Sequence, residues 1–476
     1  MAEQPNSNNL PKEQVIQLYK KAERIHPKKA TGKYANLRIL MILVTQLFFY
    51  GMPWLMWDDR QAVWFDLAGR HFYIFGLVLM ANDLLLLTGL LVISAFGLFW
   101  WTTIAGRLWC GYACPQTVYT EIMLWIDHLV EGDRNKRMKL DKEPWNARKI
   151  RIKLTKYLLI FVVAAWTGIT FAGWFVPIRE FVPAIFHGTA GAGSFGVAAF
   201  YGFVTWLFGH IMRGQVCFYM CPYARFQSAM FDHDTLVISY DTERGEPRGA
   251  RKKNISREET PLGDCINCTM CVQVCPTGID IRDGLQYQCI GCAACIDACN
   301  EVMDKMNYPR GLIRYTTEAV LNKEYTDAQI KKRLLRPKVV WYGGLLMLAL
   351  IGLLTFGFTR DTLNVDIMKD RAAMARTNQD GLLENTYRLR LTNASEKTQM
   401  VKLEVSGFKD IRLTGQPENG VRVKGGGSEM VIVQVATQPE YARKGSHPIV
   451  FTFHYAPENE PNRVRDLREK ASFIGE

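Results

Sequence analysis

The chain lacks cysteine over long stretches. None of its twelve cysteines lies in the segments 58–82 and 178–193 or in the part that follows Phe358. Disulfides persist in oxidising compartments, whereas cytosolic thiols stay reduced and available to metals. We therefore expect no disulfide, and we expect every cysteine on the cytoplasmic side of a membrane or at its boundary.

Acidic residues are scarce beside the apolar runs, and this asymmetry predicts a topology. Residues 1–38 contain eight Lys and Arg against three acidic residues, and residues 131–156 contain ten against four. Residues 58–82 instead hold two Arg against three Asp. Because Lys and Arg collect on cytoplasmic loops, we predict a cytoplasmic N-terminus and an outer C-terminus. The formal net charge of +12 is then a membrane signal, and nucleic-acid binding is not expected.

Five hydrophobic runs are long enough to cross a bilayer, which takes roughly 20 helical residues. They are approximately Leu37–Trp57, Asp83–Ala105, Tyr157–Pro177, Ser194–Met212 and Val339–Phe358. Before the second, apolar residues begin at Phe72 and are interrupted at Asn82, which is compatible with a half-helix leading into the span. Residues 1–36 are polar and long, so no cleavable signal peptide is expected before the first span.

Eight cysteines form two matching runs of the pattern C-x-x-C-x-x-C-x-x-x-C, the first followed by Pro276. This is the bacterial two-cluster ferredoxin pattern, in which the fourth cysteine of each run binds the other cluster. We assign one 4Fe–4S cluster to Cys265, Cys268, Cys271 and Cys299, and the other to Cys275, Cys289, Cys292 and Cys295. Such clusters carry single electrons, so redox work is predicted.

Two other interpretations of these cysteines are a disulfide scaffold and a pair of zinc sites. Zinc sites use well-separated C-x-x-C pairs or include histidine, and no histidine lies between Cys265 and Cys299. The tight, doubled spacing therefore favours iron–sulfur clusters. Asn300 stands where a proline would complete the second run, which affects the local backbone rather than ligation.

The remaining four cysteines form a second repeat, C-x-x-x-C-P, placed after each of two predicted helical hairpins. The motifs are Cys110/Cys114 with Pro115, and Cys217/Cys221 with Pro222. On one continuous helix, sulfurs four residues apart share a face, and the prolines can break the helix and aim the second sulfur. Paired thiolates suit a soft metal such as Cu(I) or an iron–sulfur cluster; packing as small buried hydrophobes is the other interpretation.

Each C-x-x-x-C-P motif is followed by an Asp-His pair, which ends in His128 in one repeat and in His233 in the other. Either histidine could add a metal ligand, although solvated surface histidines are commoner beside charged loops. The role of both histidines stays open at this point.

After the fifth span the pattern changes to short runs of alternating apolar and polar residues, which is typical of antiparallel strands. The runs are Thr386–Leu391, Met400–Val405, Glu429–Val435 and Ile449–Tyr455. Their number and length favour a β-sandwich of immunoglobulin type. The Cys…Trp…Cys hallmark of true immunoglobulin domains is absent, so this prediction concerns architecture alone.

These parts give a multi-domain membrane protein with α-helical spans, a two-cluster ferredoxin domain and an immunoglobulin-like β-sandwich. The predicted order is a cytoplasmic segment 1–36, a four-span membrane domain 37–233, a cytoplasmic ferredoxin domain 234–336, a fifth transmembrane helix 337–359 and a periplasmic β domain 360–476.

The whole chain resembles the CcoG family, also called FixG or RdxA. The resemblance rests on the order of its parts, which are the paired motifs after membrane hairpins, the ferredoxin runs and the outer β domain. Members of this family are accessory proteins of cbb3-type cytochrome c oxidase assembly in the bacterial inner membrane. The resemblance implies a cupric reductase, an oxidoreductase that converts Cu(II) to Cu(I) for the oxidase. It implies a copper site at Cys110, Cys114, Cys217 and Cys221, fed with electrons by the clusters. The implied partners are a cytoplasmic electron donor, a copper-exporting P-type ATPase, copper chaperones and oxidase subunits.

Two alternatives stay open. The paired motifs also resemble the membrane polyferredoxins NapH and NosR, which implies quinol-linked electron transfer. NapH lacks the β domain after Arg360, and NosR carries an outer flavin domain before its first span. The chain is also compatible with a non-enzymatic scaffold for oxidase assembly whose clusters are structural. A homodimer is compatible with the sequence, but nothing in it requires one.

Overall fold

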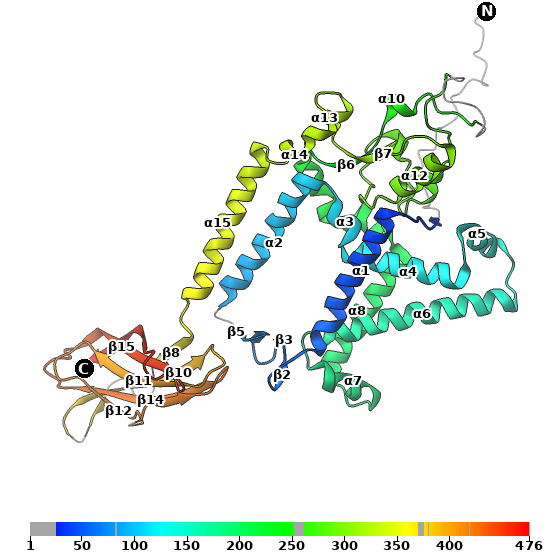
Figure 1. Ribbon diagram of the computed structural model, residues 1–476. Coiled ribbons are helices and arrows are strands. Elements are labelled where there is room, and N and C mark those ends of the chain that lie inside the picture. Colours follow the sequence, from blue (N-terminus) through cyan, green and yellow to red (C-terminus); the bar gives the residue numbers. More distant parts are fainter. Residues whose placement is uncertain are drawn as a thin grey trace, which may run out of the picture.

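The computed structural model describes residues 25–80, 83–251, 261–369, 376–378, 380–417 and 419–475. Long helices occupy the centre of the molecule, the ferredoxin domain lies at one end of them, and the β domain lies at the other (Figure 1). This arrangement places the cysteine-rich part and the cysteine-free β domain on opposite sides of the helical layer.

Five helices in the described part of the chain are long and apolar enough to cross a membrane. They are α1 (Lys33–Gly51, continued by η1 at Met52–Trp54), α2 (Leu84–Ala105), α6 (Ala147–Ala172), α8 (Ala192–Trp206, continued by η3 at Leu207–Met212) and α15 (Pro337–Thr359). The five predicted spans are confirmed. The third begins earlier than the sequence indicated, at Ala147, because the lysines of its first turns are buried against acidic partners and not solvated.

The membrane helices pack in two groups. Helices α2 and α15 lie side by side, and α6 packs against α8 (Figure 1). The second contact is a backbone-to-backbone approach, since a Cβ atom on Gly168 would lie 2.1 Å from the Ala198 carbonyl oxygen. Small residues allow this close packing where lipid offers no hydrophobic driving force between helices.

The segment before α2 is a small antiparallel sheet and not a half-helix. Strands β3 (Val63–Asp66), β4 (His71–Ile74) and β5 (Leu77–Met80) pair in that order, after the two-residue strands β1 (Met56–Trp57) and β2 (Arg60–Gln61). The half-helix expected from Phe72 is therefore wrong. Aromatic and β-branched residues favour strands, and a tight turn at Phe75, whose φ is +51°, reverses the chain. Asn82 lies outside the described residues.

This small sheet joins the membrane helices to the β domain. Arg360, just after α15, places Nη1 2.5 Å from an Asp83 carboxylate oxygen and donates from Nη2 to the Val78 carbonyl at 2.9 Å. Val78 and Met80 also pack with Ala394 in one buried cluster, and Arg60 pairs with Glu396. The β domain is thus attached by ionic and apolar contacts as well as by the chain.

Shorter helices connect the spans at the ferredoxin end. They are α3 (Leu108–Tyr112), α4 (Pro115–Glu131), α5 (Arg134–Lys142), η4 (Val216–Met220), α9 (Pro222–Phe226) and η5 (Gln227–Met230). At the other end, α7 (Ile178–Phe186) links α6 to α8.

The ferredoxin domain is framed by a two-stranded antiparallel sheet, β6 (Val237–Tyr240) with β7 (Ile313–Thr316). Between these strands lie α10 (Thr242–Gly245), α11 (Met270–Gln273), η7 (Ile281–Asp283) and α12 (Ala294–Met306). Helices α13 (Glu318–Leu321), η8 (Asp327–Gln329) and α14 (Ile330–Arg333) lead to α15. Side chains of α12 and β7 share one apolar core with Cys265 and Cys271, so the cysteine loops are built onto a packed support.

The C-terminal part is a two-sheet β-sandwich, as predicted. One sheet has the order β12-β14-β10-β8 with β9 paired to β10, and the other has the order β13-β11-β15-β16. The strands are β8 (Leu363–Lys369), β9 (Arg376–Thr377), β10 (Leu383–Asn393), β11 (Gln399–Ser406), β12 (Arg412–Thr414), β13 (Val421–Val423), β14 (Ser428–Thr437), β15 (Gly445–Pro457) and β16 (Arg465–Gly475). The four predicted runs lie within β10, β11, β14 and β15. Alternate residues such as Leu389, Val433 and Phe451 are fully buried between the sheets.

Candidate functional site

Each C-x-x-x-C-P motif spans a break between two helices. Cys110 lies in α3, but Cys114 is extended, with φ −63° and ψ 127°, and precedes Pro115 at the start of α4. The expectation that both sulfurs share one helix face is therefore wrong. A residue before proline is disfavoured in the helical conformation, and proline itself fits the first turn of a helix. The proline thus ends one helix, begins the next, and turns the second sulfur.

The second motif repeats this arrangement. Cys217 lies in the π-helical turn η4, and Cys221 is extended, with φ −76° and ψ 112°, immediately before α9. All four cysteines are partly buried. The two motifs therefore present their cysteines in equivalent local settings, at the ferredoxin end of the molecule.

The structure brings these four cysteines together. Burial raises the pKa of the Cys110 thiol to about 12, and negative charge on Cys114, Cys217 or Cys221 would raise it further. Burial likewise raises the pKa of Cys217 to about 11, again with Cys114 and Cys221 as neighbouring groups. The two motifs thus lie close enough for their thiols to influence one another, and we call these four thiols the four-cysteine group.

Contacts between the two repeats hold this group closed. The Gln116 side-chain amide, two residues after Cys114, donates to the Phe208 and Arg213 carbonyls at 2.9 Å each. The Arg213 guanidinium, before Cys217, lies 2.7 Å from an Asp127 oxygen. Burial alone would raise the pKa of Asp127, but Arg213 and Lys156 outweigh it and lower that pKa to about 2. The first repeat thus holds both the backbone and the side chain of Arg213, four residues before Cys217.

A buried ionic cluster extends from this contact into α6. Lys156 is fully buried, with Nζ 3.0 Å from carboxylate oxygens of both Asp127 and Glu131. Lys153 lies 2.7 Å from Glu131 and 2.6 Å from Asp141. A buried pair tolerates loss of a partner poorly, because the remaining charge is stranded out of water. This cluster therefore ties α4, α5 and α6 into a rigid support for the first motif.

The eight ferredoxin cysteines separate into two groups of four. Burial raises the pKa of Cys299 to about 12, and the groups that raise it further are Cys271, Cys268 and Cys265. Burial raises the pKa of Cys295 as well, and Cys292, Cys289, Cys275 and, to the smallest extent, Cys271 of the other group raise it further. The last cysteine of each run thus lies with the first three cysteines of the other run, which is the arrangement that crossed ligation requires. The ligand assignment itself stays a prediction.

Backbone geometry repeats between the two runs. The residue before the second cysteine has positive φ in both, Asn267 at +53° and Gly291 at +68°. The residue after it does too, Thr269 at +56° and Ala293 at +58°. Such conformations are uncommon outside glycine and mark tight functional turns. The two loops therefore follow the same backbone path around their second cysteines.

Four thiols in each group match the donor number of a 4Fe–4S cluster, so the residues fit two such clusters. Among the residues that the structure describes, no group of three or more His, Cys, Asp or Glu side chains forms a ready site for a single metal ion. The two histidines have other partners. His128 contacts Arg137 at 3.4 Å, and His233 is exposed and pairs with Glu318 at 3.1 Å.

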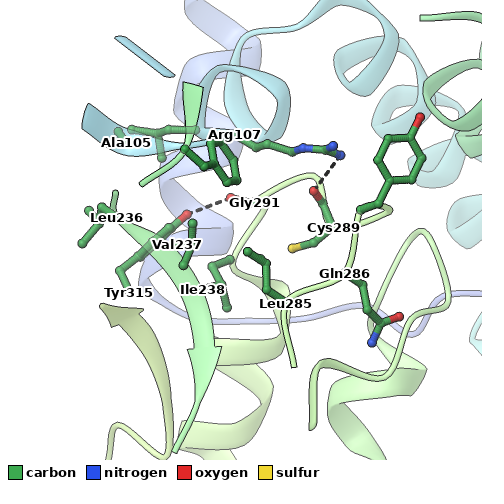
Figure 2. Close-up of a pocket in the computed structure, with 13 residues that line it drawn as sticks. Ala105, Arg107, Leu236, Val237, Ile238, Leu285, Gln286, Cys289, Gly291 and Tyr315 are labelled. Atoms are coloured by element: carbon green, nitrogen blue, oxygen red, sulfur yellow. Dashed lines mark hydrogen bonds between the residues drawn. The ribbon is translucent and has the colours of Figure 1, made fainter. Parts of the chain in front are cut away.

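The segment that carries Cys110 touches the loop of the second ferredoxin group. A Cβ on Gly111 would lie 2.7 Å from the Gly291 carbonyl oxygen and 2.9 Å from Cys292 Cα. Arg107 donates from Nη1 to the Cys289 carbonyl at 3.0 Å (Figure 2). It also donates from Nη2 to the Ala224 carbonyl at 3.0 Å. Sequence reasoning missed both contacts. The arginine that precedes the first cysteine in each C-x-x-x-C-P motif was the available signal.

A mostly apolar cavity of about 200 Å³ lies beside this contact. Figure 2 shows Arg107 and Cys289 on one side of it and Leu236, Val237 and Tyr315 on the other. The Tyr315 hydroxyl donates to the Gly291 carbonyl at 2.7 Å. Membrane-end and ferredoxin residues therefore line one shared space.

Comparison with known proteins covers both parts of this site. Residues 87–137 match the family model of a 4Fe-4S binding domain, residues 212–318 match a 4Fe-4S dicluster domain, and residues 353–476 match the IG-like fold at the C-terminal of FixG. The nitrogen fixation protein FixG of Rhizobium meliloti (strain 1021) is 37% identical over 84% of this chain and 82% of its own length.

Two proteins of Cereibacter sphaeroides are similar to the same extent. Protein RdxB is 37% identical over 87% of this chain and 88% of its own length. Protein RdxA is 34% identical over 85% of this chain and 87% of its own length. These matches extend over the membrane, ferredoxin and β parts together.

Proposed function

Because the chain belongs to the family of FixG, RdxA and RdxB, and is a membrane 4Fe–4S electron-transfer protein, we propose that it reduces Cu(II) to Cu(I). The copper is the substrate, and the four-cysteine group is its site. We further propose that this copper serves the assembly of a cbb3-type oxidase. The observation that carries the proposal is the direct contact between the segment that carries Cys110 and the loop of the second ferredoxin group.

The chemistry of the four-cysteine group suits the product of this reaction. Thiolates are soft ligands and favour Cu(I) over Cu(II), so copper held there accepts an electron readily. When bound, 4Fe–4S clusters supply reversible one-electron transfer. Each turnover moves one electron and converts one Cu(II) to one Cu(I). A thiol must lose its proton to bind metal, and the raised pKa of Cys110 and Cys217 means that copper displaces protons there.

The topology proposed for this reaction puts the N-terminus and ferredoxin domain in the cytoplasm and the β domain in the periplasm of the bacterial inner membrane. It is supported by the basic residues at the ferredoxin end and by the separation of the two domains by the membrane helices (Figure 1). A cytoplasmic donor then supplies the electrons. A copper-exporting P-type ATPase, copper chaperones and oxidase subunits are the proposed partners, and a homodimer remains an open arrangement.

Quinol-linked electron transfer is the second candidate, and one observation favours it. An apolar groove of about 750 Å³ between α1, α2 and α3 ends at Trp109 and Tyr112, beside Cys110. A lipid-soluble ring could enter there from the bilayer. A quinol would donate two electrons, one to each of the two clusters, and would release its two protons to water.

An anaerobic titration separates these candidates. The clusters are reduced with dithionite, excess reductant is removed on a desalting column, and stoichiometric Cu(II) is added with a Cu(I)-specific chelator. We expect one chelated Cu(I) for each cluster electron lost in EPR and visible spectra. The variant Cys110→Ser with Cys217→Ser should keep both clusters and lose this reaction, because a hydroxyl is a poor ligand for Cu(I).

The outcomes that contradict copper reduction are equally definite. If the double variant binds and reduces copper as the parent does, the four-cysteine group is not the copper site. Cluster oxidation by a quinone analogue, with no response to copper, would establish the quinol-linked candidate. A scaffold with structural clusters predicts that folded variants of the ferredoxin cysteines still support oxidase assembly, whereas a reductase predicts that they do not.

A further inference from the structure

The two ferredoxin groups differ in what surrounds them. Cys268 of the first group is exposed to solvent, and Cys265 and Cys271 pack in the core of the ferredoxin domain. Cys292 of the second group is buried in a separate apolar cluster that includes Cys110 of the four-cysteine group. One group therefore faces the solvent and the other faces the membrane motifs.

Two glycines bring the backbones of the second group and the first C-x-x-x-C-P motif into contact. A Cβ on Gly111 would meet the backbone of Gly291 and Cys292 at 2.7 to 2.9 Å. A Cβ on Gly291, whose φ is +68°, would lie 3.0 Å from the Arg107 carbonyl oxygen. Real Cβ atoms do not approach backbone so closely, so each contact depends on the missing side chain.

Arg107 connects the same two segments through its side chain. Its guanidinium spans from the Cys289 carbonyl to the Ala224 carbonyl, three residues after Cys221, and lies over the Tyr287 ring at 5.3 Å. It therefore joins the second ferredoxin group to both C-x-x-x-C-P motifs. Its charge also acts on both sites, since it lowers the pKa of Cys110, Cys217 and Cys289 against the larger effect of burial.

We propose that the cluster held by Cys275, Cys289, Cys292 and Cys295 is the immediate electron donor to the four-cysteine group, and that Arg107 is the positioning residue of this junction. One electron leaves the reduced cluster and converts one Cu(II) to Cu(I), and no bond to hydrogen or carbon forms or breaks. The electron enters from a low-potential one-electron carrier at the exposed side of the other cluster. This inference rests on the proposed function in taking copper at the four-cysteine group as the electron acceptor. The role of Arg107 toward the cluster does not depend on copper.

The physical basis is distance and charge. Electron tunnelling falls steeply with separation, so a backbone contact without intervening side chains favours transfer. The potential of an iron–sulfur cluster depends on nearby charge and hydrogen bonds. A fixed cation beside Cys289 stabilises the reduced, more negative state and thereby raises that cluster's potential. Arg282 lies beside Cys271 of the solvent-facing group in the same way, so the direction of transfer rests on the backbone contact and not on charge alone.

Gly111→Ala tests the contact, with Gly344→Ala as its matched control, because a Cβ at Gly344 would meet nothing within 4 Å. Both variants of the full-length protein are purified, and iron, sulfide and EPR spectra establish cluster content. In single-turnover oxidation of the reduced clusters by Cu(II), we expect Gly111→Ala to be at least tenfold slower than the parent and Gly344→Ala to match it. Equal rates for both variants would overturn the contact.

Arg107→Met and Arg107→Lys test the side chain without requiring copper. In an EPR-monitored redox titration, Arg107→Met should shift one cluster to more negative potential and leave the other unchanged. Arg107→Lys should restore the potential, because it keeps the charge, but not the transfer rate, because one ammonium cannot span two carbonyls as the guanidinium fork does. Unchanged potentials in Arg107→Met would overturn the positioning role. If Arg107→Met shows the potential shift but the parent never reduces Cu(II), the proposed function alone is overturned.

Discussion

The two C-x-x-x-C-P motifs have similar sequences but different supports. The first is docked on the ferredoxin domain through Gly111 and continues into α4, whose Asp127 is 2% exposed. The second is preceded by Arg213, a non-glycine residue with φ +46°. Its downstream Asp232 pairs with Arg336, just before α15, at 2.9 Å and with Lys338, in the first turn of α15, at 3.6 Å. Both motifs contact the ferredoxin domain, the first through Gly111 and the second through the Phe218 carbonyl, which accepts a hydrogen bond from the Tyr287 hydroxyl at 3.0 Å. They differ in the carboxylate behind them, which is buried at Asp127 and more exposed at Asp232, so duplication of a motif does not imply duplication of its support.

Loss of the Asp127 carboxylate should cause the largest change. Asp127→Ala removes a partner of the half-buried Arg213 and the buried Lys156, and we expect a loss of about 3–5 kcal/mol in stability, together with release of the second motif. Thermal unfolding in detergent or nanodiscs measures it. The contribution of Asp127 is present above the unfolded pKa near 3.9 and is lost as pH falls toward the folded value of about 2.

The matched substitution in the other repeat is Asp232→Ala. The Asp232 side chain is 27% exposed against 3% for Asp127, although its partner Arg336 is buried, so we expect a smaller loss, about 1 kcal/mol, and no effect on copper binding. Equal losses in the two variants would show that the repeats are supported alike, and would contradict the comparison.

Copper uptake should depend steeply on pH. The pKa of Cys110 and Cys217 is raised by burial to about 12 and about 11, so both thiols are protonated near neutrality and must release protons to bind Cu(I). We expect the apparent Cu(I) affinity to rise about tenfold for each pH unit and each proton released. Competition with a Cu(I) chelator at pH 6, 7 and 8 measures this slope. An affinity independent of pH would mean that the thiols are not the ligands.

Breaking the contact between the ferredoxin domain and α1 should lower stability by a smaller amount. The buried Asp297 of α12 accepts hydrogen bonds from the Ala35 and Tyr34 amides at 2.7 and 3.3 Å, and so caps the first turn of α1. Asp297→Ala should cost about 1 kcal/mol, as loss of other helix caps does. Hydrogen exchange at the start of α1 should rise in this variant while exchange in the β domain stays unchanged. Protection retained at α1 would contradict the capping role.

Much of this molecule could be predicted from its sequence because the patterns are local. Apolar length predicted the five spans, alternation predicted β10, β11, β14 and β15, and cysteine spacing predicted two groups of four. Phe72–Met80 misled because a short apolar run does not distinguish a half-helix from paired strands.

The junction could not be predicted, since it depends on contacts between distant segments. Gly111 meets Gly291, and Arg213 meets Asp127, only after the hairpins have packed. The sequence showed two glycines and two ordinary charges at these positions. Proline in each motif indicated a helix break, and the repeated hairpins indicated that the two motifs would lie near one another, but not which residues would join them.

The central claim is that the four cysteines of the two repeats form one copper site. X-ray absorption of the protein loaded anaerobically with one equivalent of Cu(I) tests this most directly, with single Cys110→Ser and Cys221→Ser variants beside the parent. We predict sulfur-only ligation in the parent and an altered copper environment in both single variants, because each motif contributes ligands to the same ion. Nitrogen or oxygen ligation in the parent, or a spectrum that responds to only one of the two motifs, would contradict the account.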